Sequence, residues 1–160
     1  MSSSGQDDER RRRAHSSGLH PAPASEGRSA NMRAIRRRNT KPEVALASAL
    51  HRAGYRFRRD LPVKIDGVTI RPDIVFTKQR VAIFVDGCFW HACPEHGRAP
   101  KVNDWYWLPK LQRTQERDAR NERLLRSHDW LVLRIWEHVA VDDAMGRAVE
   151  ALASAAGAGN

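Results

Sequence analysis

The sequence lacks long apolar runs and contains few cysteines. No apolar run approaches the ~20 residues of a transmembrane helix, and the polar N-terminus lacks the apolar core of a secretory signal. The two cysteines, Cys88 and Cys93, lie five positions apart, which is not the pattern of a disulfide framework. These absences argue against a membrane protein and against a disulfide-rich secreted protein. We therefore expect a cytoplasmic protein, without membrane contact, whose thiols bind a metal.

The chain is strongly basic. Its 160 residues carry a net charge of +9, and 41% of them are hydrophobic, which suffices for a single domain with a buried core. Residues 1–28 hold five arginines and four acidic residues and so contribute +1, which leaves +8 on residues 29–160. This excess favours nucleic acid as the partner, against the alternative of a solvated basic surface.

Three regions differ in composition. Residues 1–28 are rich in Ser, Gly, Pro and charge without periodicity, and we predict a disordered basic and polar arm. Residues 29–156 are expected to form a single domain, and residues 157–160 a frayed C-terminus. Within the domain we predict helices at 40–53, 105–127 and 141–156, and strands at 55–59, 64–70 (a hairpin), 71–76, 81–85 and 131–136. This order predicts an α/β fold, a small mixed β-sheet flanked by helices.

The stretch from Val81 to His96 organises the rest of the chain. The apolar, β-branched run at 81–85 predicts a strand buried on both faces, and Asp86-Gly87 ends it. Two large aromatic residues and an alternation of Cys and His follow directly. Because the ends of strands are where sheet proteins build their sites, we expect a functional site here.

The Cys and His residues of this stretch have the spacing of a structural zinc loop. Cys88, Cys93 and His96 supply two thiolates and an imidazole, whereas a structural zinc site needs four ligands. His138 is the best candidate for the fourth, because it follows the last predicted core strand; His91 and His128 are the alternatives. The competing interpretation is two buried free thiols.

A catalytic metal is predicted beside the same strand. Asp73 precedes a strand and faces the end of strand 81–85, where one carboxylate can hold Mg²⁺ for phosphodiester hydrolysis. His91 is a candidate acceptor of the proton from the attacking water. The alternatives are structural: Asp73 is a turn residue, and Glu43 completes a capping box with Thr40 at the start of the first helix.

Aromatic residues are concentrated near the zinc loop. Phe89, Trp90 and Trp107 suit apolar wedges that enter between base pairs, or alternatively a lid over the loop. Residues 31–38 are basic, with Met32 and Ile35 on one helical face. That segment either docks on the core or presents both side chains to DNA.

Together these features resemble the Vsr family of very-short-patch repair endonucleases, within the restriction-endonuclease-like PD-(D/E)XK fold. The resemblance covers about Asn31 to His138. It is carried by Asn31-Met32-Arg33-Ala34-Ile35, Thr40-Lys41-Pro42-Glu43, Arg71-Pro72-Asp73, Gly87-Cys88-Phe89-Trp90-His91, Trp107, Arg117-Asp118 and the run from Asp129 to Glu137. It implies a Mg²⁺-dependent enzyme that nicks one strand of double-stranded DNA at T:G mismatches, which arise from deamination of 5-methylcytosine. The expected protein is a monomer, associated with the nucleoid through DNA, with mismatch-repair proteins as candidate partners.

The resemblance also implies roles for individual residues. Asp73 and the backbone carbonyl of Val85 would bind Mg²⁺, His91 would be the general base, and Glu43 would act through the hydration shell of the metal. The wedge would be Phe89, Trp90 and Trp107, and the minor-groove contacts would be Asn31, Met32 and Ile35. The structural zinc ligands would be Cys88, Cys93, His96 and His138.

Two departures from the family pattern matter. His138 stands where members commonly carry Cys. Asp86 stands where some have His, and this extra carboxylate could add a Mg²⁺ ligand, so that one-metal and two-metal schemes both remain open. Two other functions stay in view: a restriction-associated nuclease of the same fold with another target, and a zinc-stabilised DNA-binding module that does not cut.

Overall fold

The structure is a computed structural model of the chain, and it describes residues 39–101 and 103–158. The predicted arm and the predicted DNA contacts Asn31, Met32 and Ile35 lie outside these residues. The described elements are α3 (Lys41–Arg52), β1 (Arg58–Arg59), β2 (Val63–Ile65), β3 (Val68–Ile70), β4 (Ile74–Phe76), β5 (Val81–Asp86), α4 (Asp104–Ser127), β6 (Leu131–Trp136) and α5 (Val141–Gly157).

A four-stranded mixed sheet with the order β1-β4-β5-β6 forms the centre of the molecule. β5 pairs antiparallel with β4 and parallel with β6, so that Ile83 lies opposite both Ile74 and Leu133. As an inner strand, β5 is covered on both faces, which explains its apolar sequence. β2 and β3 form a separate hairpin around Asp66-Gly67, where φ is 48° and 78°. Two consecutive positive φ values are those of the primed turn that Asp-Gly predicts.

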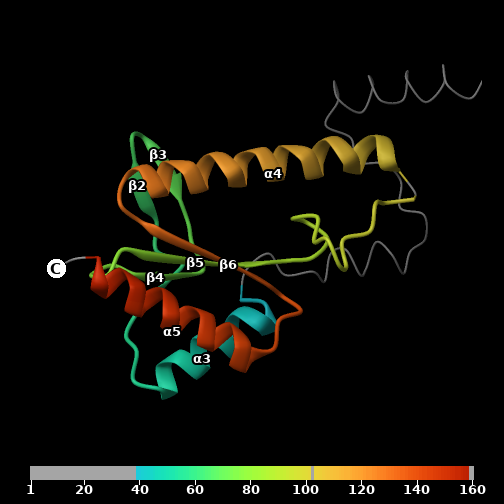
Figure 1. Cartoon of the computed structure of the whole chain (residues 1–160). Coiled ribbons are helices and arrows are strands. Elements are labelled where there is room, and N and C mark those ends of the chain that lie inside the picture. The colour runs from blue at the N-terminus through green and yellow to red at the C-terminus, as the bar shows by residue number, and fades with distance from the viewer. Residues whose placement is uncertain (1–38, 102, 159–160) are drawn as a thin grey trace, which may run out of the picture.

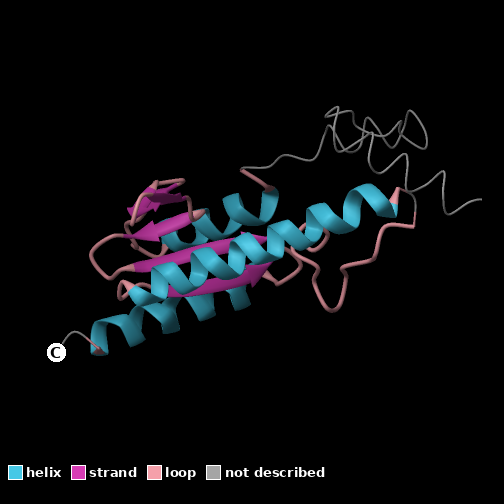
Figure 2. Cartoon of the chain, turned by 90° about the horizontal axis from the view of Figure 1, so that it is seen from above, coloured by secondary structure: helices cyan, strands magenta, loops and turns pink. Residues whose placement is uncertain are grey.

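Helices cover both faces of the sheet (Figures 1 and 2). α3 and α5 pack together on one face, where Ala144, Ala148 and Ala151 recur at helical spacing and permit close approach. α4 covers the other face, with Leu125 fully buried against the sheet and the hairpin. The predicted α/β architecture, a mixed sheet flanked by helices, is confirmed.

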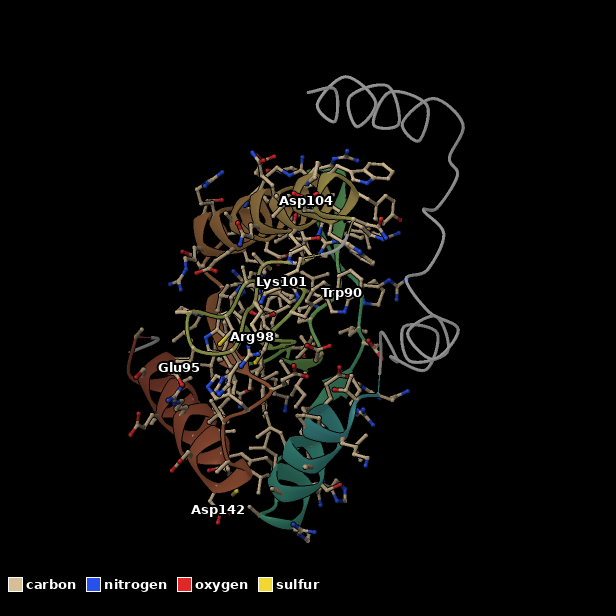
Figure 3. All side chains as sticks on the ribbon, turned by 90° about the vertical axis from the view of Figure 1, so that its right-hand side faces the viewer. Trp90, Glu95, Arg98, Lys101, Asp104 and Asp142 are labelled. Carbon is tan, nitrogen blue, oxygen red and sulfur yellow. The ribbon has the colours of Figure 1, made fainter. Side chains whose placement is uncertain are left out.

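α4 is longer than the strands, and its N-terminal part extends past the sheet (Figures 1 and 2). The segment between β5 and α4 lies below this part of the helix in Figure 1. Figure 3 shows the same segment end-on, with Trp90, Arg98 and Lys101 between α4 above and the pair of α3 and α5 below. Among the described residues, no helix has both the length and the apolar character needed to cross a membrane.

Two local predictions are wrong. Of the strand predicted at 55–59, only Arg58 and Arg59 pair with β4, because the N–H of Tyr55 donates to the carbonyl of Leu50 and still closes the end of α3. The capping box is also absent. The hydroxyl of Thr40 donates to the Glu43 carboxylate (2.9 Å) and not to the helix backbone. Glu43 is 5% exposed, and a buried carboxylate needs such a donor.

Candidate active site and metal cluster

Asp73 lies immediately before β4 and beside the end of β5. Its N–H donates to the carbonyl of Ile83 (3.0 Å), and its carboxylate accepts the N–H of Val85 (2.7 Å). The antiparallel pairing of β4 with β5 places it there. Asp73 thus faces the end of strand 81–85, as predicted, and its role as a metal ligand stays a prediction.

The surroundings of Asp73 are acidic. Burial raises its pKa to about 7, against the opposing hydrogen bond from Val85, and the charges of Glu43, Asp60 and Asp86 raise it further. A carboxylate in such a position is destabilised unless a proton or a cation joins it. A divalent cation with oxygen ligands fits this site chemically.

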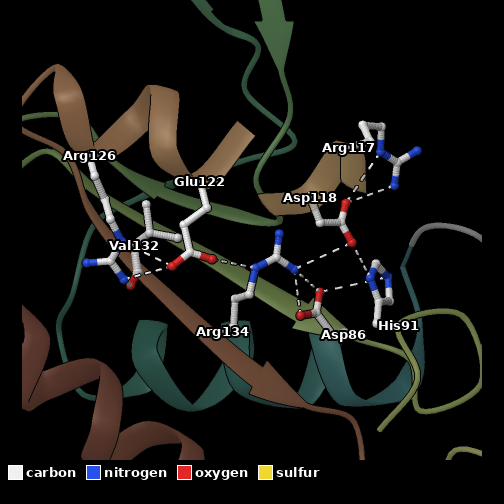
Figure 4. A network of polar contacts seen from close by, with 8 residues as sticks. All are labelled: Asp86, His91, Arg117, Asp118, Glu122, Arg126, Val132 and Arg134. Carbon is white, nitrogen blue, oxygen red and sulfur yellow. Dashed lines mark hydrogen bonds and ion pairs between the residues drawn. The ribbon is translucent and has the colours of Figure 1, made fainter. Parts of the chain in front are cut away.

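His91 is held between two carboxylates. His91 lies in the turn that follows β5, where its backbone N–H donates to the carbonyl of Gly87 (3.1 Å). Nδ1 is 2.5 Å from the Asp118 carboxylate, and Nε2 is 3.8 Å from Asp86 (Figure 4). Burial opposes ionisation of Asp118, but its hydrogen bond to His91 and the charges of His91, Arg117 and Arg134 lower its pKa. An ionised Asp118 fixes the orientation of the ring, with Nε2 on the side of Asp86, and the role of His91 as a general base stays a prediction.

The four predicted zinc ligands converge. The donor atoms of Cys88, Cys93, His96 and His138 all lie within 4.8 Å of one another. His138 Nδ1 is 3.2 Å from Cys88 Sγ, 3.7 Å from Cys93 Sγ and 3.2 Å from His96 Nδ1. For zinc bond lengths of about 2.3 Å to sulfur and about 2.0 Å to nitrogen, a tetrahedron has edges of about 3.3–3.8 Å. The donor set fits zinc in both type and spacing, and the competing ligands lie elsewhere: His91 contacts Asp118 and His128 contacts Asp66.

The protonation of the thiols and the backbone of the loop also suit a bound metal. Burial and the adjacent Cys93 thiol raise the pKa of the Cys88 thiol to about 11, so that this sulfur becomes a thiolate only beside a strong cation. Burial of Cys93 opposes its ionisation, but hydrogen bonds from the backbone of His96 and Glu95 lower the pKa of this second thiol. The Cys88 N–H donates to the Glu137 carboxylate (2.8 Å), which ties the loop to the end of β6. At Gly97, a Cβ would lie 2.5 Å from the Cys93 carbonyl oxygen, so the turn that carries His96 requires glycine.

The predicted aromatic residues form one cluster beside this loop. The ring centroids of Phe89, Trp90 and Trp107 lie 5.2–5.7 Å apart in edge-to-face arrangements. The ammonium group of Lys110 lies 5.2 Å from the Trp107 ring centroid and 5.5 Å from that of Trp90. All three aromatic side chains are only half-buried. The cluster is therefore accessible to a partner, which a lid sealed over the zinc loop would not be.

Comparison with known proteins agrees with this site. A model of the family "DNA mismatch endonuclease Vsr" matches residues 23–95. The type II nicking enzyme V.NaeI of Lentzea aerocolonigenes is 54% identical over 143 residues, covering 89% of this chain and 86% of that protein. DNA mismatch endonuclease Vsr of Escherichia coli (strain K12) is 40% identical over 114 residues, 69% of each chain. This chain belongs to the Vsr family. The resemblance drawn from its sequence is confirmed, and the Vsr-family protein is a metal-dependent DNA endonuclease.

Sequence reasoning gave no role to two residues of the Vsr-family site. Asp118 entered only as part of a matching motif, and nothing in the charged middle of α4 distinguishes it from Glu116 or Glu122. Arg134 is the single charged residue of β6, and that oddity is the signal that could have found it. Asp118 contacts His91 only after α4 packs over the sheet, and Arg134 contacts Asp86 only after β6 pairs with β5.

An apolar hollow of the Vsr-family protein lies on the α3 and α5 side of the sheet. A pocket of about 240 Å³ opens between α3, β6 and α5. Its lining is mostly apolar, and of the predicted site residues it includes only Val85. Asp73 and His91 are only half-buried at the ends of the strands, which suits a substrate as large as a duplex.

Proposed function

We propose that this protein nicks one strand of double-stranded DNA at T:G mismatches that arise from deamination of 5-methylcytosine, by Mg²⁺-dependent hydrolysis of a phosphodiester bond. The observation that carries the proposal is the edge of the sheet where Asp73 meets Val85 and where Asp118 orients His91. The relative from Escherichia coli is named a mismatch endonuclease, and the relative from Lentzea aerocolonigenes a nicking enzyme.

In this proposal Asp73 and the carbonyl of Val85 hold the Mg²⁺ ion, and Glu43 contacts its hydration shell. The ion neutralises phosphate charge and activates water when bound. His91 accepts the water proton at Nε2 while Nδ1–H donates to Asp118. The water oxygen bonds to phosphorus, the bond to the leaving oxygen breaks, and that oxygen takes a proton from a second, solvent water molecule.

The aromatic cluster supports recognition of a mismatch. Phe89, Trp90 and Trp107 would enter the duplex as a wedge, and unstacking costs least where pairing is already faulty. Asn31, Met32 and Ile35 would contact the minor groove. The net charge of +9 supports binding to the phosphate backbone and predicts that affinity falls steeply with salt.

Zinc at Cys88, Cys93, His96 and His138 would have a structural role. The four side chains would supply all four ligands of a tetrahedral zinc site, which would leave no open position for substrate. We further propose a monomer that meets its substrate on the nucleoid in the cytoplasm; mismatch-repair proteins are the candidate partners.

A nicking assay tests this function. The full chain with Mg²⁺ would be given labelled T:G duplexes in several methylation-site contexts, with T:A and C:G duplexes as controls. We expect one nick beside the mismatched T, none with EDTA, and none with Asp73→Ala. The exposed-site variant Asp129→Ala is the matched control and should nick normally, because its side chain is 92% exposed. A protein that binds T:G duplex tightly without cutting would instead be a non-catalytic module.

A second candidate function follows from the names of several relatives. V.NaeI and V.XorIIP of Xanthomonas oryzae pv. oryzae, which is 42% identical over 111 residues, are both type II nicking enzymes. This chain would then act beside a restriction system and nick another target. Cutting of matched duplex in the same assay would favour this alternative. Trp90→Ala separates the two further, because a mismatch wedge predicts weaker binding of T:G duplex with little change for matched duplex.

A further inference from the structure

Asp86 ends β5 beside the proposed metal site, yet its carboxylate is already partnered. Asp86 is buried, with 5% of its surface exposed. Nη1 of Arg134 lies 2.8 Å from one carboxylate oxygen and 2.6 Å from the other (Figure 4). Both oxygens therefore accept from a cation of the protein, whose positive charge disfavours a metal ion at the same carboxylate.

Arg134 is itself fixed from several sides. Nε donates to the Glu122 carboxylate of α4 (3.2 Å), and the guanidinium lies 4.7 Å from the ring centroid of Phe84. Nη1 also lies 3.8 Å from Asp118. Glu122 is held in turn by Arg126, so a chain of ion pairs links α4 to the end of β5 (Figure 4). The position of the guanidinium is set by packing and not by Asp86 alone.

Removing this cation would change the charge of the site. Asp86 and Asp118 flank His91, and Asp86 also adds its negative charge to the surroundings of Asp73. An unpaired buried carboxylate is costly and acquires a proton or a cation. Beside a magnesium site the available cation is a second divalent ion, for which carboxylate oxygen is a suitable ligand.

We propose that Arg134 is a positioning residue that keeps Asp86 out of the divalent-metal shell, so that the site binds a single divalent ion, at Asp73. The inference rests on the proposed function, which places the ion at Asp73. It concerns Arg134, a residue to which the proposed function gives no role. It decides between the one-metal and two-metal schemes that the sequence leaves open. Asp86 then stays paired with Arg134 and does not bind the divalent ion.

Counting Mn²⁺ ions tests the proposal without any turnover. The zinc-loaded full chain, free of DNA, would be titrated with Mn²⁺ and followed by electron paramagnetic resonance. We expect one bound ion in the natural protein, none in Asp73→Ala, and a second in Arg134→Met. Arg134→Lys keeps the cation and should bind one ion. Arg126→Met removes a cation from the same network without touching Asp86, and it should also bind one ion.

The double variant Asp86→Asn/Arg134→Met keeps the test decisive if Arg134→Met alone does not fold. It removes both charges, and replacing a buried pair by neutral groups is commonly tolerated. We expect one ion, with a Kd within about threefold of the natural protein, since no ligand has been lost.

Three outcomes would overturn the proposal: two ions in the natural protein, a single ion in folded Arg134→Met, or a double variant that no longer binds the ion. The last would show that Asp86 is a ligand. Failure of the proposed function looks different, because a protein that binds one Mn²⁺ ion as described but cuts no duplex leaves the ion count intact.

Discussion

Replacing Asp73 by Asn should stabilise the metal-free protein at alkaline pH while abolishing activity. The amide has the shape of the protonated acid, and its oxygen still accepts the Val85 N–H that now lies 2.7 Å from the carboxylate. What the substitution removes is the negative charge among Glu43, Asp60 and Asp86. Where several carboxylates are gathered to bind a metal, an ionised carboxylate is expected to lower the stability of the metal-free folded protein.

The magnitude follows from the pKa. A rise of the Asp73 pKa from 3.8 to about 7 corresponds to roughly 4 kcal/mol, and because the side chain is only half-buried, screening reduces the expected effect to about 2 kcal/mol. The folded state holds the proton more tightly than the unfolded state. The stability that the protonated group confers is therefore full below about pH 4 and is lost as pH rises through about 7.

Thermal unfolding of the zinc-loaded protein, with no other divalent ion, measures this. At pH 8 the Tm of Asp73→Asn should exceed that of the natural protein by about 4–8 °C, and the difference should shrink toward pH 4. Added Mg²⁺ should raise the Tm of the natural protein only. Asp129→Asn removes the same charge from a side chain 92% exposed and should leave the Tm nearly unchanged. A difference that does not vary with pH, or a destabilised Asp73→Asn, would refute the reasoning.

Three other predictions concern the surrounding residues. Asp118→Asn should lower kcat about 10²-fold with little change in duplex affinity, because His91 loses the carboxylate at Nδ1. A loss of duplex affinity as large as the loss of kcat would contradict this. Cys93→Ser should lose zinc and have a lower Tm, whereas His138→Cys should keep the ion; metal analysis of the purified proteins measures the zinc content. Gly97→Ala should weaken zinc binding because its Cβ meets the Cys93 carbonyl at 2.5 Å, whereas Gly146→Ala, in open space within α5, should not.

The sequence was most informative where one local pattern decides the structure. The apolar run of β5 required a covered inner strand, and Asp66-Gly67 admits little besides a primed turn. Convergence of the four Cys and His side chains could be expected because His138 follows a strand that had to pair beside β5. Each of these inferences depends on neighbours in sequence or on one strand pairing.

The failures share a different cause. Thr40 and Glu43 have the spacing of a capping box, but burial of Glu43 drew the hydroxyl to its carboxylate. The contact of Asp118 with His91 depends on how α4 is rotated over the sheet, which no local pattern records. The pairing of Arg134 with Asp86 likewise needs the register of β5 against β6, with Asp86 opposite Trp136 and Arg134 two residues earlier.

The metal cluster has a topological consequence. Cys88 follows β5 and His138 follows β6, 50 residues apart, and the chain between them contains the whole of α4. With zinc bound, the metal would link the two ends of the connection between β5 and β6. A link that closes a loop of this length restricts the conformations of the unfolded chain, as a disulfide cross-link does. The ion would also hold the turn with His91 against the helix that carries Asp118. Loss of zinc would therefore loosen the catalytic pair from a distance, although no zinc ligand is proposed to touch the substrate.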